Sequence, residues 1–126
     1  MTKPLDEKGL QIRRDMFGAD FVEKRSAEAT DFTQPFVEMV NNFAFGEVWQ
    51  RPGLDRKQRS MLTLAMLVAG NHTNEMPLHV RGAISNGVTK EEIREVLLHA
   101  VAYCGFPAAF TAFRVMGDTL KEMGLN

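Results

Sequence analysis

The sequence lacks the marks of several large protein classes. It contains a single cysteine, Cys104, among its 126 residues, which excludes a disulfide within one chain and any CxxC redox or metal motif. No apolar run is long enough to cross a bilayer, and the first residues carry no stretch of signal-peptide character. We therefore expect a soluble, cytoplasmic protein with no membrane partner.

An excess of charge of one sign is also missing. The 15 lysine and arginine residues nearly balance the 16 aspartate and glutamate residues, so the formal net charge is −1. The basic residues are scattered along the chain and form no long stripe that would attract a nucleic-acid backbone. We predict no nucleic-acid partner.

Helical periodicity is present along most of the chain. Apolar residues recur at spacings of three and four, and no segment alternates as a strand does. Caps, prolines and glycines mark the expected boundaries. In chain order these are Asp6 to Gly18, a start at Asp20 with Glu23, Thr33 to Gly46, Asp55 to about Gly70, Thr73 or Asn74 to Asn86, Thr89 to Gly105, and a start at Pro107. The prediction is one all-α domain over residues 1–126, with about six to seven helices.

Two of these helices have especially clear starts. Asp55 with Gln58, and Thr89 with Glu92, have the spacing of reciprocal capping boxes. The helix after Asp55 is apolar on nearly every side, so we expect it to be central in the domain or covered by a partner subunit. The aromatic residues of the segment from Thr33 to Gly46 are expected in the core.

Ionisable residues concentrate between two apolar helices, from Asn71 to Val88. In a helix that starts near Thr73, Glu75 and His79 share a face because they are four residues apart. Pro77 fits the first turn, where its missing N–H has no partner to lose. The spacing therefore places a carboxylate and an imidazole in one environment.

A metal site is an alternative interpretation of this stretch. His72, Glu75 and His79 carry imidazole and carboxylate groups, which suit several transition metals. The turn position of His72 breaks regular helical spacing, however, and no fourth ligand is evident. Helix-dipole stabilisation alone also explains Glu75 in a first turn.

The sizeable connector, residues 47–54, holds a second group of candidate residues. Pro52 and Gly53 predict a turn, and such loops often carry functional groups. The candidates are therefore Glu47, Trp49 and Arg51. As alternatives, Glu47 could be an exposed acid, Trp49 could anchor the loop or a subunit contact, and Arg51 could be a solvated side chain. Arg59 is a further candidate, and it could instead pair across one helical turn.

Taken together, these segments resemble the carboxymuconolactone decarboxylase family, which shares its fold with the alkylhydroperoxidase D-like proteins. The resemblance covers nearly the whole chain. The segments that carry it are Phe45 to Leu54, Arg59-Ser60, Glu75, His79 to Ala83, Asn86 to Thr89, Glu92-Ile93 and Tyr103 to Ala109. It implies an alkylhydroperoxidase D-like helical bundle.

One feature of the peroxidase branch is absent. Those relatives carry a CxxC pair at positions that Glu75 and His72 occupy here, so the thiol route to peroxide reduction is missing. Cys104 is alone in an apolar helix and is interpreted as a small buried side chain. A peroxidase-related protein without the pair stays an alternative.

The resemblance implies decarboxylation of 4-carboxymuconolactone, or a similar carboxylated lactone, to an enol-lactone in the β-ketoadipate pathway of aromatic catabolism. The substrate's own conjugated carbonyl would accept the electrons, so no cofactor is expected. The resemblance implies His79 as proton donor with Glu47 as its partner. It also implies Arg51 or Arg59 on the acetate arm, and Trp49 at the substrate.

Two further expectations complete the prediction. The alternative function is a family member without decarboxylase activity that binds a small molecule or serves in assembly. The resemblance and the many apolar helix faces predict a homo-oligomer, a trimer or a hexamer, with the active site near a subunit boundary.

Overall fold

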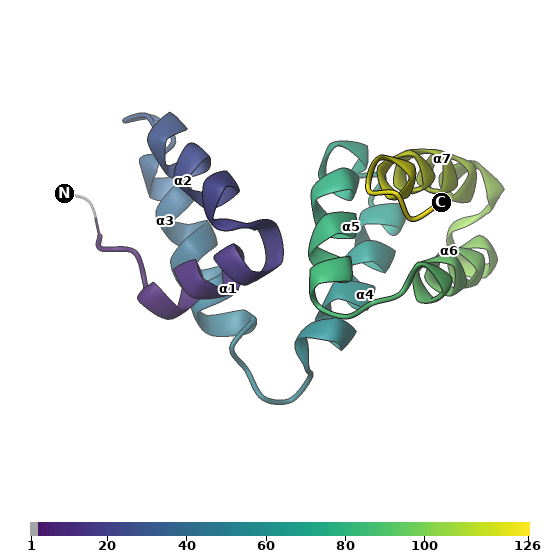
Figure 1. The fold of residues 1–126 in the computed structure, drawn as a ribbon, viewed down its shortest axis with the longest axis horizontal. Helices are drawn as coiled ribbons and strands as arrows, with labels where there is room; N and C mark the ends of the chain where they lie inside the picture. Colours follow the sequence, from purple (N-terminus) through teal and green to yellow (C-terminus); the bar gives the residue numbers. More distant parts are fainter. Residues whose placement is uncertain (1–2) are drawn as a thin grey trace. The chain divides into compact units, whose positions relative to one another are not determined.

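The computed structural model describes residues 3–126, in which every regular element is helical and no strand is found (Figure 1). The prediction of an all-α chain is confirmed. The elements are α1 Glu7–Phe17, α2 Ala19–Glu28, α3 Gln34–Met39, the π-helix η1 Val40–Val48, α4 Arg56–Ala69, the 3₁₀ turn η2 Thr73–Glu75, α5 Met76–Ser85, α6 Lys90–Cys104 and α7 Phe106–Glu122. They form two compact units, one ending at Leu54 and the other starting at Asp55. A single domain over residues 1–126 stays a prediction.

In the first unit, α1 packs against both α2 and η1. The Asp6 side chain caps α1 as predicted, with its Oδ2 accepting a hydrogen bond from the Gly9 N–H at 2.8 Å. A small apolar cluster joins α1 to η1. Its residues are Ile12, Met16 and Phe45, with Phe17, Val40, Ala44 and Trp49 packed around them.

Three sequence predictions for this unit are wrong. Helix α2 begins at Ala19, directly after Gly18, so Asp20 lies inside its first turn and is not its cap. Gly46 does not end the third helix, because η1 continues through it to Val48. Apart from Phe45, the aromatic residues expected in the core lie at the surface, with Phe36 69% exposed and Phe43 58% exposed.

The second unit has its own core, to which all four of its α-helices contribute. Helix α4 contacts α5, α6 and α7, so within this unit it has the central place that was one of the two predicted alternatives. Its Leu64 and Val68 are buried, whereas Leu62 and Met66 are exposed. The buried residues of this core are Leu64, Val68, Met76, Val80, Ala83, Val88, Ile93, Leu97, Ala100, Ala112, Met116 and Leu120.

Both predicted capping boxes form. Asp55 and Gln58 exchange hydrogen bonds at the start of α4, and Thr89 and Glu92 do so at the start of α6. The Glu92 carboxylate also bonds Lys57 Nζ at 2.9 Å, so the two helix starts are linked. The hydrogen bond from Lys57, followed by that from the Thr89 backbone N–H, lowers the pKa of Glu92.

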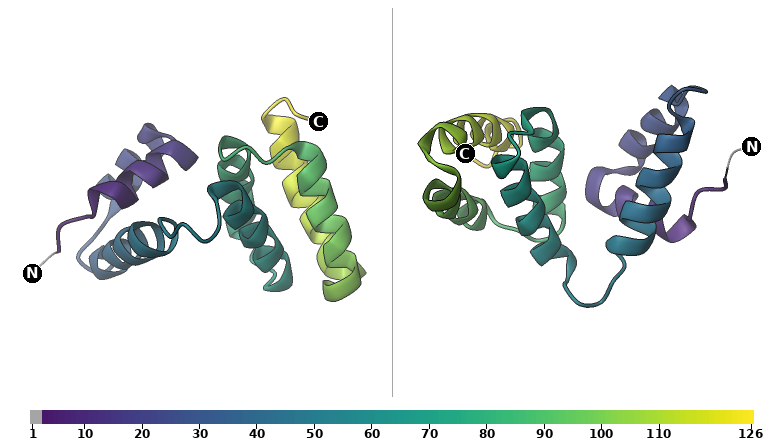
Figure 2. Two further views of the ribbon diagram at one scale, coloured as in Figure 1. Left: turned by 90° about the horizontal axis from the view of Figure 1, so that it is seen from below. Right: turned by 180° about the vertical axis from the view of Figure 1, so that it is seen from behind.

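Helices α6 and α7 lie alongside each other, as Figure 2 shows. Gly105 joins them with φ 86°, a conformation that a residue with a side chain rarely adopts. Met116 of α7 is buried, whereas Phe110 and Phe113 of the same helix are exposed. Within residues 3–126, no helix combines the length and apolar character needed to cross a membrane.

Candidate functional site

His79 lies in the first half of α5, on a helix that the core holds firmly. Met76 and Val80 on either side of it are completely buried, and Pro77 sits in the first turn as predicted. The imidazole is half-buried, and this burial lowers the pKa of His79. The nearby Glu75 carboxylate acts in the opposite direction and partly restores the pKa. Glu75 thus influences the pKa of His79, in line with the spacing that predicted a shared environment.

The three members of the alternative metal site do not form one group among residues 3–126. Glu75 is exposed at the end of η2, and His72 is exposed in the turn after α4. The His72 ring folds back onto Gly70, where an added Cβ would collide with it. No group of three or more His, Cys, Asp or Glu side chains among residues 3–126 is placed to hold a metal ion.

Arg59 lies in the first turns of α4 and is half-buried. The next residue, Ser60, is buried, and its Oγ accepts a hydrogen bond from Asn86 Nδ2 at 2.9 Å. Because Asn86 ends α5, this bond fixes the end of the helix that carries His79 against the start of the helix that carries Arg59. Cys104 is half-buried and packs against the same core, consistent with its predicted character.

Glu47, Trp49 and Arg51 lie in the first unit, at and just beyond the end of η1. Glu47 is exposed in the last turn of the π-helix, so the prediction that it belongs to a loop is wrong. The half-buried Trp49 stacks on Phe45 with ring centroids 5.8 Å apart, which is the anchoring contact left open by the sequence. Arg51 is exposed, and its N–H bonds Val48 O in the turn that follows.

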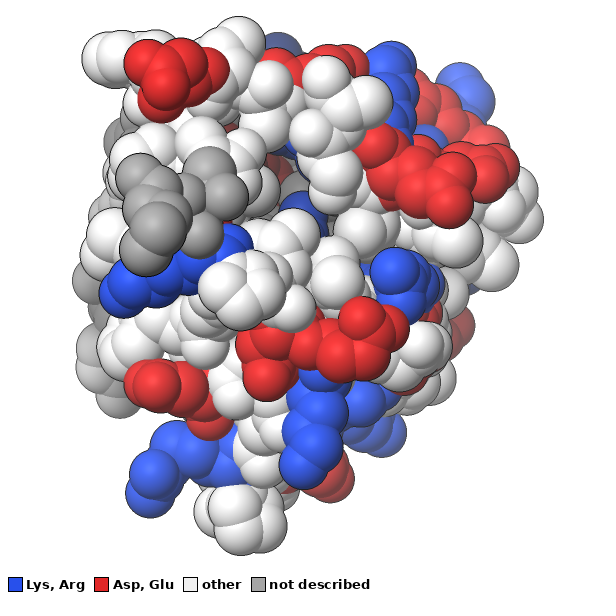
Figure 3. Space-filling model, turned by 90° about the vertical axis from the view of Figure 1, so that its left-hand side faces the viewer, with Lys and Arg blue, Asp and Glu red and all other residues white. Residues whose placement is uncertain are grey.

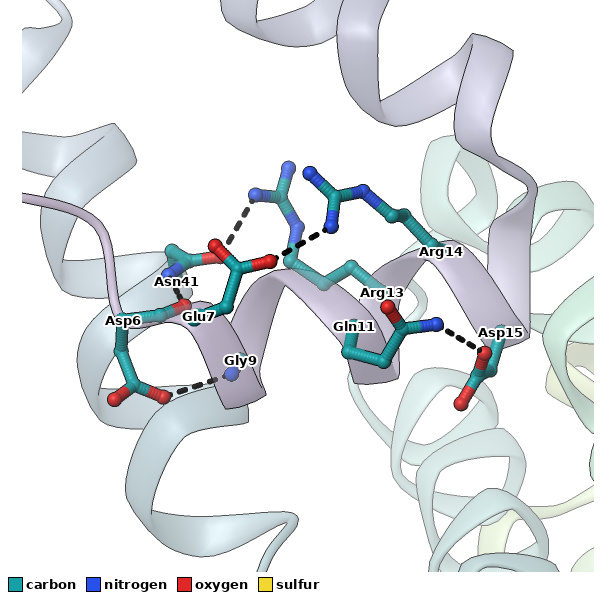
Figure 4. A network of polar contacts seen from close by, with 8 residues as sticks. All are labelled: Asp6, Glu7, Gly9, Gln11, Arg13, Arg14, Asp15 and Asn41. Carbon is teal, nitrogen blue, oxygen red and sulfur yellow. Dashed lines mark hydrogen bonds and ion pairs between the residues drawn. The ribbon is translucent and has the colours of Figure 1, made fainter.

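A buried polar network that the sequence did not predict joins α1 to the start of η1. The buried Asn41 of η1 accepts a hydrogen bond from Arg13 and donates one to Asp6 O (Figure 4). Burial, with a further contribution from Arg25, lowers the pKa of Arg13. The available signal was the pair Asn41-Asn42, since two adjacent amides in an otherwise apolar helical segment predict buried polar partners.

The charged surface agrees with the balanced composition. On the face shown in Figure 3, basic and acidic side chains are interspersed. Elsewhere in the described residues charged side chains also pair, such as Arg14 with Glu7 and Arg81 with Glu122, each at 3.1 Å. This face offers no extended basic surface of the kind that binds nucleic acid.

Comparison with known proteins supplies the family. Residues 34–118 match the model of the carboxymuconolactone decarboxylase family, a span that contains Glu47, Trp49, Arg51, Arg59 and His79. The chain belongs to this family. The match begins at the start of α3, so α1 and α2 lie outside it.

Two curated relatives cover nearly the whole chain. A nitrosuccinic acid decarboxylase of Metarhizium robertsii is 48% identical over 123 residues, which are 98% of this chain and 86% of that protein. A 4-carboxymuconolactone decarboxylase of Acinetobacter baylyi is 38% identical over 119 residues, 94% of this chain and 89% of that protein.

Proposed function

We propose that the protein is a carboxy-lyase that decarboxylates a small dicarboxylic acid and uses the substrate itself as electron acceptor. The family and two relatives named as decarboxylases support a carboxy-lyase activity. The observation that carries the proposal is the half-buried His79, whose lowered pKa makes its protonated form a stronger acid. Protonation at carbon after loss of carbon dioxide needs such an acid.

The first candidate substrate is 4-carboxymuconolactone or a similar carboxylated lactone. Its departing carboxylate sits on a carbon conjugated through a double bond to the lactone carbonyl. When the carbon–carbon bond breaks, its electron pair enters this system as a dienolate and carbon dioxide leaves. A proton then adds to carbon and gives the enol-lactone. No pyridoxal or thiamine is needed, because the substrate provides the electron sink.

The second candidate is nitrosuccinic acid, which the 48% identity over 98% of the chain favours. Here the carboxylate on the nitro-bearing carbon leaves, and its electron pair enters the nitro group to form a nitronate. Protonation of that carbon completes the reaction. Both candidates keep a second carboxylate throughout, so one binding arrangement serves either acid.

Within this mechanism we assign proton donation to His79 and a second proton-handling role to Glu47, as the family resemblance implies. Burial favours the neutral form of the His79 imidazole by lowering its pKa. An anionic substrate stabilises the imidazolium, and the proton then passes to carbon as the negative charge develops. Solvent returns a proton to His79 after each turnover, so the net reaction consumes one proton and releases carbon dioxide.

The basic candidates take the carboxylate that remains. A tight ion pair with the departing carboxylate would stabilise the reactant more than the transition state. We therefore assign Arg51 or Arg59 to the retained carboxylate, where the charge does not change. We assign Trp49, which stacks on Phe45, to the lining of the substrate site.

We further propose that the chain assembles into a homo-oligomer, a trimer or a hexamer. Large apolar side chains are exposed in both units, among them Phe36, Tyr103 and Phe110, each 69–80% exposed. Soluble monomers rarely expose contiguous apolar surface beyond about 300–600 Å². A closed ring of identical subunits would cover such faces symmetrically.

The decisive experiment incubates purified protein with each acid separately and follows carbon dioxide release. We expect turnover of one of the two acids, and activity that survives exhaustive chelation because no step needs an ion. Release from neither acid would contradict the proposal and favour a family member that binds a small molecule or serves in assembly. Loss of activity on chelation, restored by zinc or nickel, would instead point to a metal enzyme.

A further inference from the structure

The chain segment before α1 is bound along the helix that carries Glu47. The Lys3 N–H donates to Glu38 Oε1 at 2.7 Å, and the Asp6 N–H donates to Asn42 Oδ1 at the same distance. Asn42 Nδ2 returns a hydrogen bond to Pro4 O at 3.1 Å. Residues 3–6 thus follow α3 and the start of η1 through side chains of those helices.

Asn41 strengthens this attachment from inside the unit. It is completely buried, and its Nδ2 donates to Asp6 O and to Asn42 Oδ1, each at 3.0 Å. Its Oδ1 accepts from Arg13 of α1 at 3.1 Å. A buried amide that satisfies three partners holds one geometry, because any shift would leave a buried polar group unpaired.

Asp6 extends the contact to the other end of the π-helix. Its Oδ2 accepts a hydrogen bond from Gln50 Nε2 at 3.3 Å, and the same Nε2 donates to Gly46 O at 2.6 Å. The Asp6 side chain also lies so close to Gly46 that a Cβ built there would be 3.2 Å from Oδ2. Asp6 therefore contacts the residue directly before Glu47.

The helix to which residues 3–6 are attached, η1, has an unusual π-helical form. π-Helices are rare, occur mostly as single turns, and are frequent at functional sites. This one is nine residues long, and at its end the Trp49 N–H bonds Ala44 O, five residues back. Asn41, Asn42 and Gly46 are weak helix formers. Such weak intrinsic propensity leaves the form of the helix open to contacts from outside it, and residues 3–6 make contacts of this kind.

We propose that residues 3–6 are a positioning element for the active site. Their hydrogen bonds to Asn41 and Asn42 fix η1, and thereby the direction of Glu47. This inference rests on the proposed function, in which Glu47 handles a proton. In this proposal Asp6 and Asn42 act only through Glu47 and its helix.

The test compares Asn42→Ala with the matched control Gln11→Ala. Both changes remove an amide, but Gln11 is exposed on α1 and bonds Asp15, away from η1 (Figure 4). We expect Asn42→Ala to lower kcat about tenfold with little change in KM, since small displacements of a reacting group reduce turnover steeply. Asn42→Asp, which keeps the acceptor for the Asp6 N–H, should recover part of the loss. Gln11→Ala should match the wild type.

A double-mutant cycle separates positioning from general stability. In a Glu47→Asp background, Asn42→Ala should cost much less than in the wild type, because both changes act on one carboxylate. If Glu47→Asp is itself impaired and the kcat losses of the two single variants multiply in the double variant, the positioning role is overturned and the proposed function stands. A normal kcat in Glu47→Asp would instead remove Glu47 from the proposed mechanism, and this inference with it.

A measurement independent of turnover completes the test. Amide hydrogen exchange across residues 40–48 should accelerate in Asn42→Ala and stay unchanged in Gln11→Ala. Unchanged exchange in Asn42→Ala would show that η1 keeps its form without these bonds and would overturn the inference.

Discussion

Burial of the His79 imidazole shifts its proton equilibrium towards the neutral form, and the Glu75 carboxylate only partly opposes this shift. Such a group is a weaker base than an ordinary histidine and, once protonated, a stronger acid. Among the candidate residues, His79 is therefore the one whose surroundings match the need for an acid in a decarboxylation.

Removal of the proton-handling groups should abolish most turnover without unfolding the chain. We expect His79→Ala and Glu47→Gln each to lower kcat by about 100-fold or more, the usual contribution of a general acid. Neither side chain belongs to the buried cores. Steady-state kinetics and circular dichroism provide the measurement. His99→Ala and Glu95→Gln are matched controls on exposed positions of α6, and near-normal turnover in either test variant would refute that residue's role.

The same burial predicts a pH dependence of stability. The folded pKa of His79 is below the ordinary value of 6.5, so the unfolded chain binds more protons between the two values. The free energy of unfolding therefore rises with pH through this window, and the contribution is lost as pH falls below 6.5 towards the folded pKa. Thermal unfolding of wild type and His79→Gln between about pH 8 and pH 5 tests this. The stability of the wild type relative to the variant should fall as the pH drops below the ordinary histidine pKa. Parallel curves for the two proteins would show that His79 makes no such contribution.

Cys104 allows a test of thiol chemistry. It is half-buried against the second core and has no cysteine partner in the sequence. Cys104→Ser should leave turnover largely unchanged, while the hydroxyl in an apolar site should lower stability by about 1–3 kcal/mol. Activity and melting temperature are measured on the same sample. A folded but inactive variant would indicate a thiol mechanism after all.

At the scale of the element, local sequence accounts for the start of α6. The Thr89 side chain accepts from the Glu92 N–H at 3.1 Å, and Glu92 Oε1 accepts from the Thr89 N–H at 2.9 Å. We expect Thr89→Ala to lower the free energy of unfolding by about 1 kcal/mol, since it removes the cap. Denaturant melts provide the measurement. Thr111→Ala, which removes a hydroxyl inside α7, is the control and should be nearly neutral or stabilising. Equal losses in both would show that the cap contributes nothing of its own.

Helix η1 shows where local sequence was insufficient. Gly46 is an ordinary helix stop by propensity, yet η1 continues through it to Val48. The Gln50 side chain donates to Gly46 O and to Asp6 Oδ2, so a contact with a distant segment lies at Gly46 that helix propensity does not include. This difference moves Glu47 from a loop to a helix, where its direction depends on the backbone geometry of that helix.

At the scale of the whole molecule, the exposed aromatic residues predict assembly. We expect light scattering at micromolar concentration to report a trimer at least, with a hexamer as the favoured form. Phe110→Glu, at a position 73% exposed in one chain, should weaken the assembly if this face is an interface. Lys121→Glu, on an exposed polar position of the same helix, is the control. A stable, active wild-type monomer would contradict the assembly proposal.

The sequence by itself determined the helical class, the central α4, both capping boxes, the breaks at Gly18 and Gly105, and the shared environment of Glu75 and His79. These features depend on residues at most four apart or on the periodicity of one helix, so the information is local. Only the tertiary structure decided the burial of Asn41, the π form of η1 and the exposure of Phe36 and Phe110. Each of these depends on which distant segment packs against the residue, and helical periodicity carries no information about that.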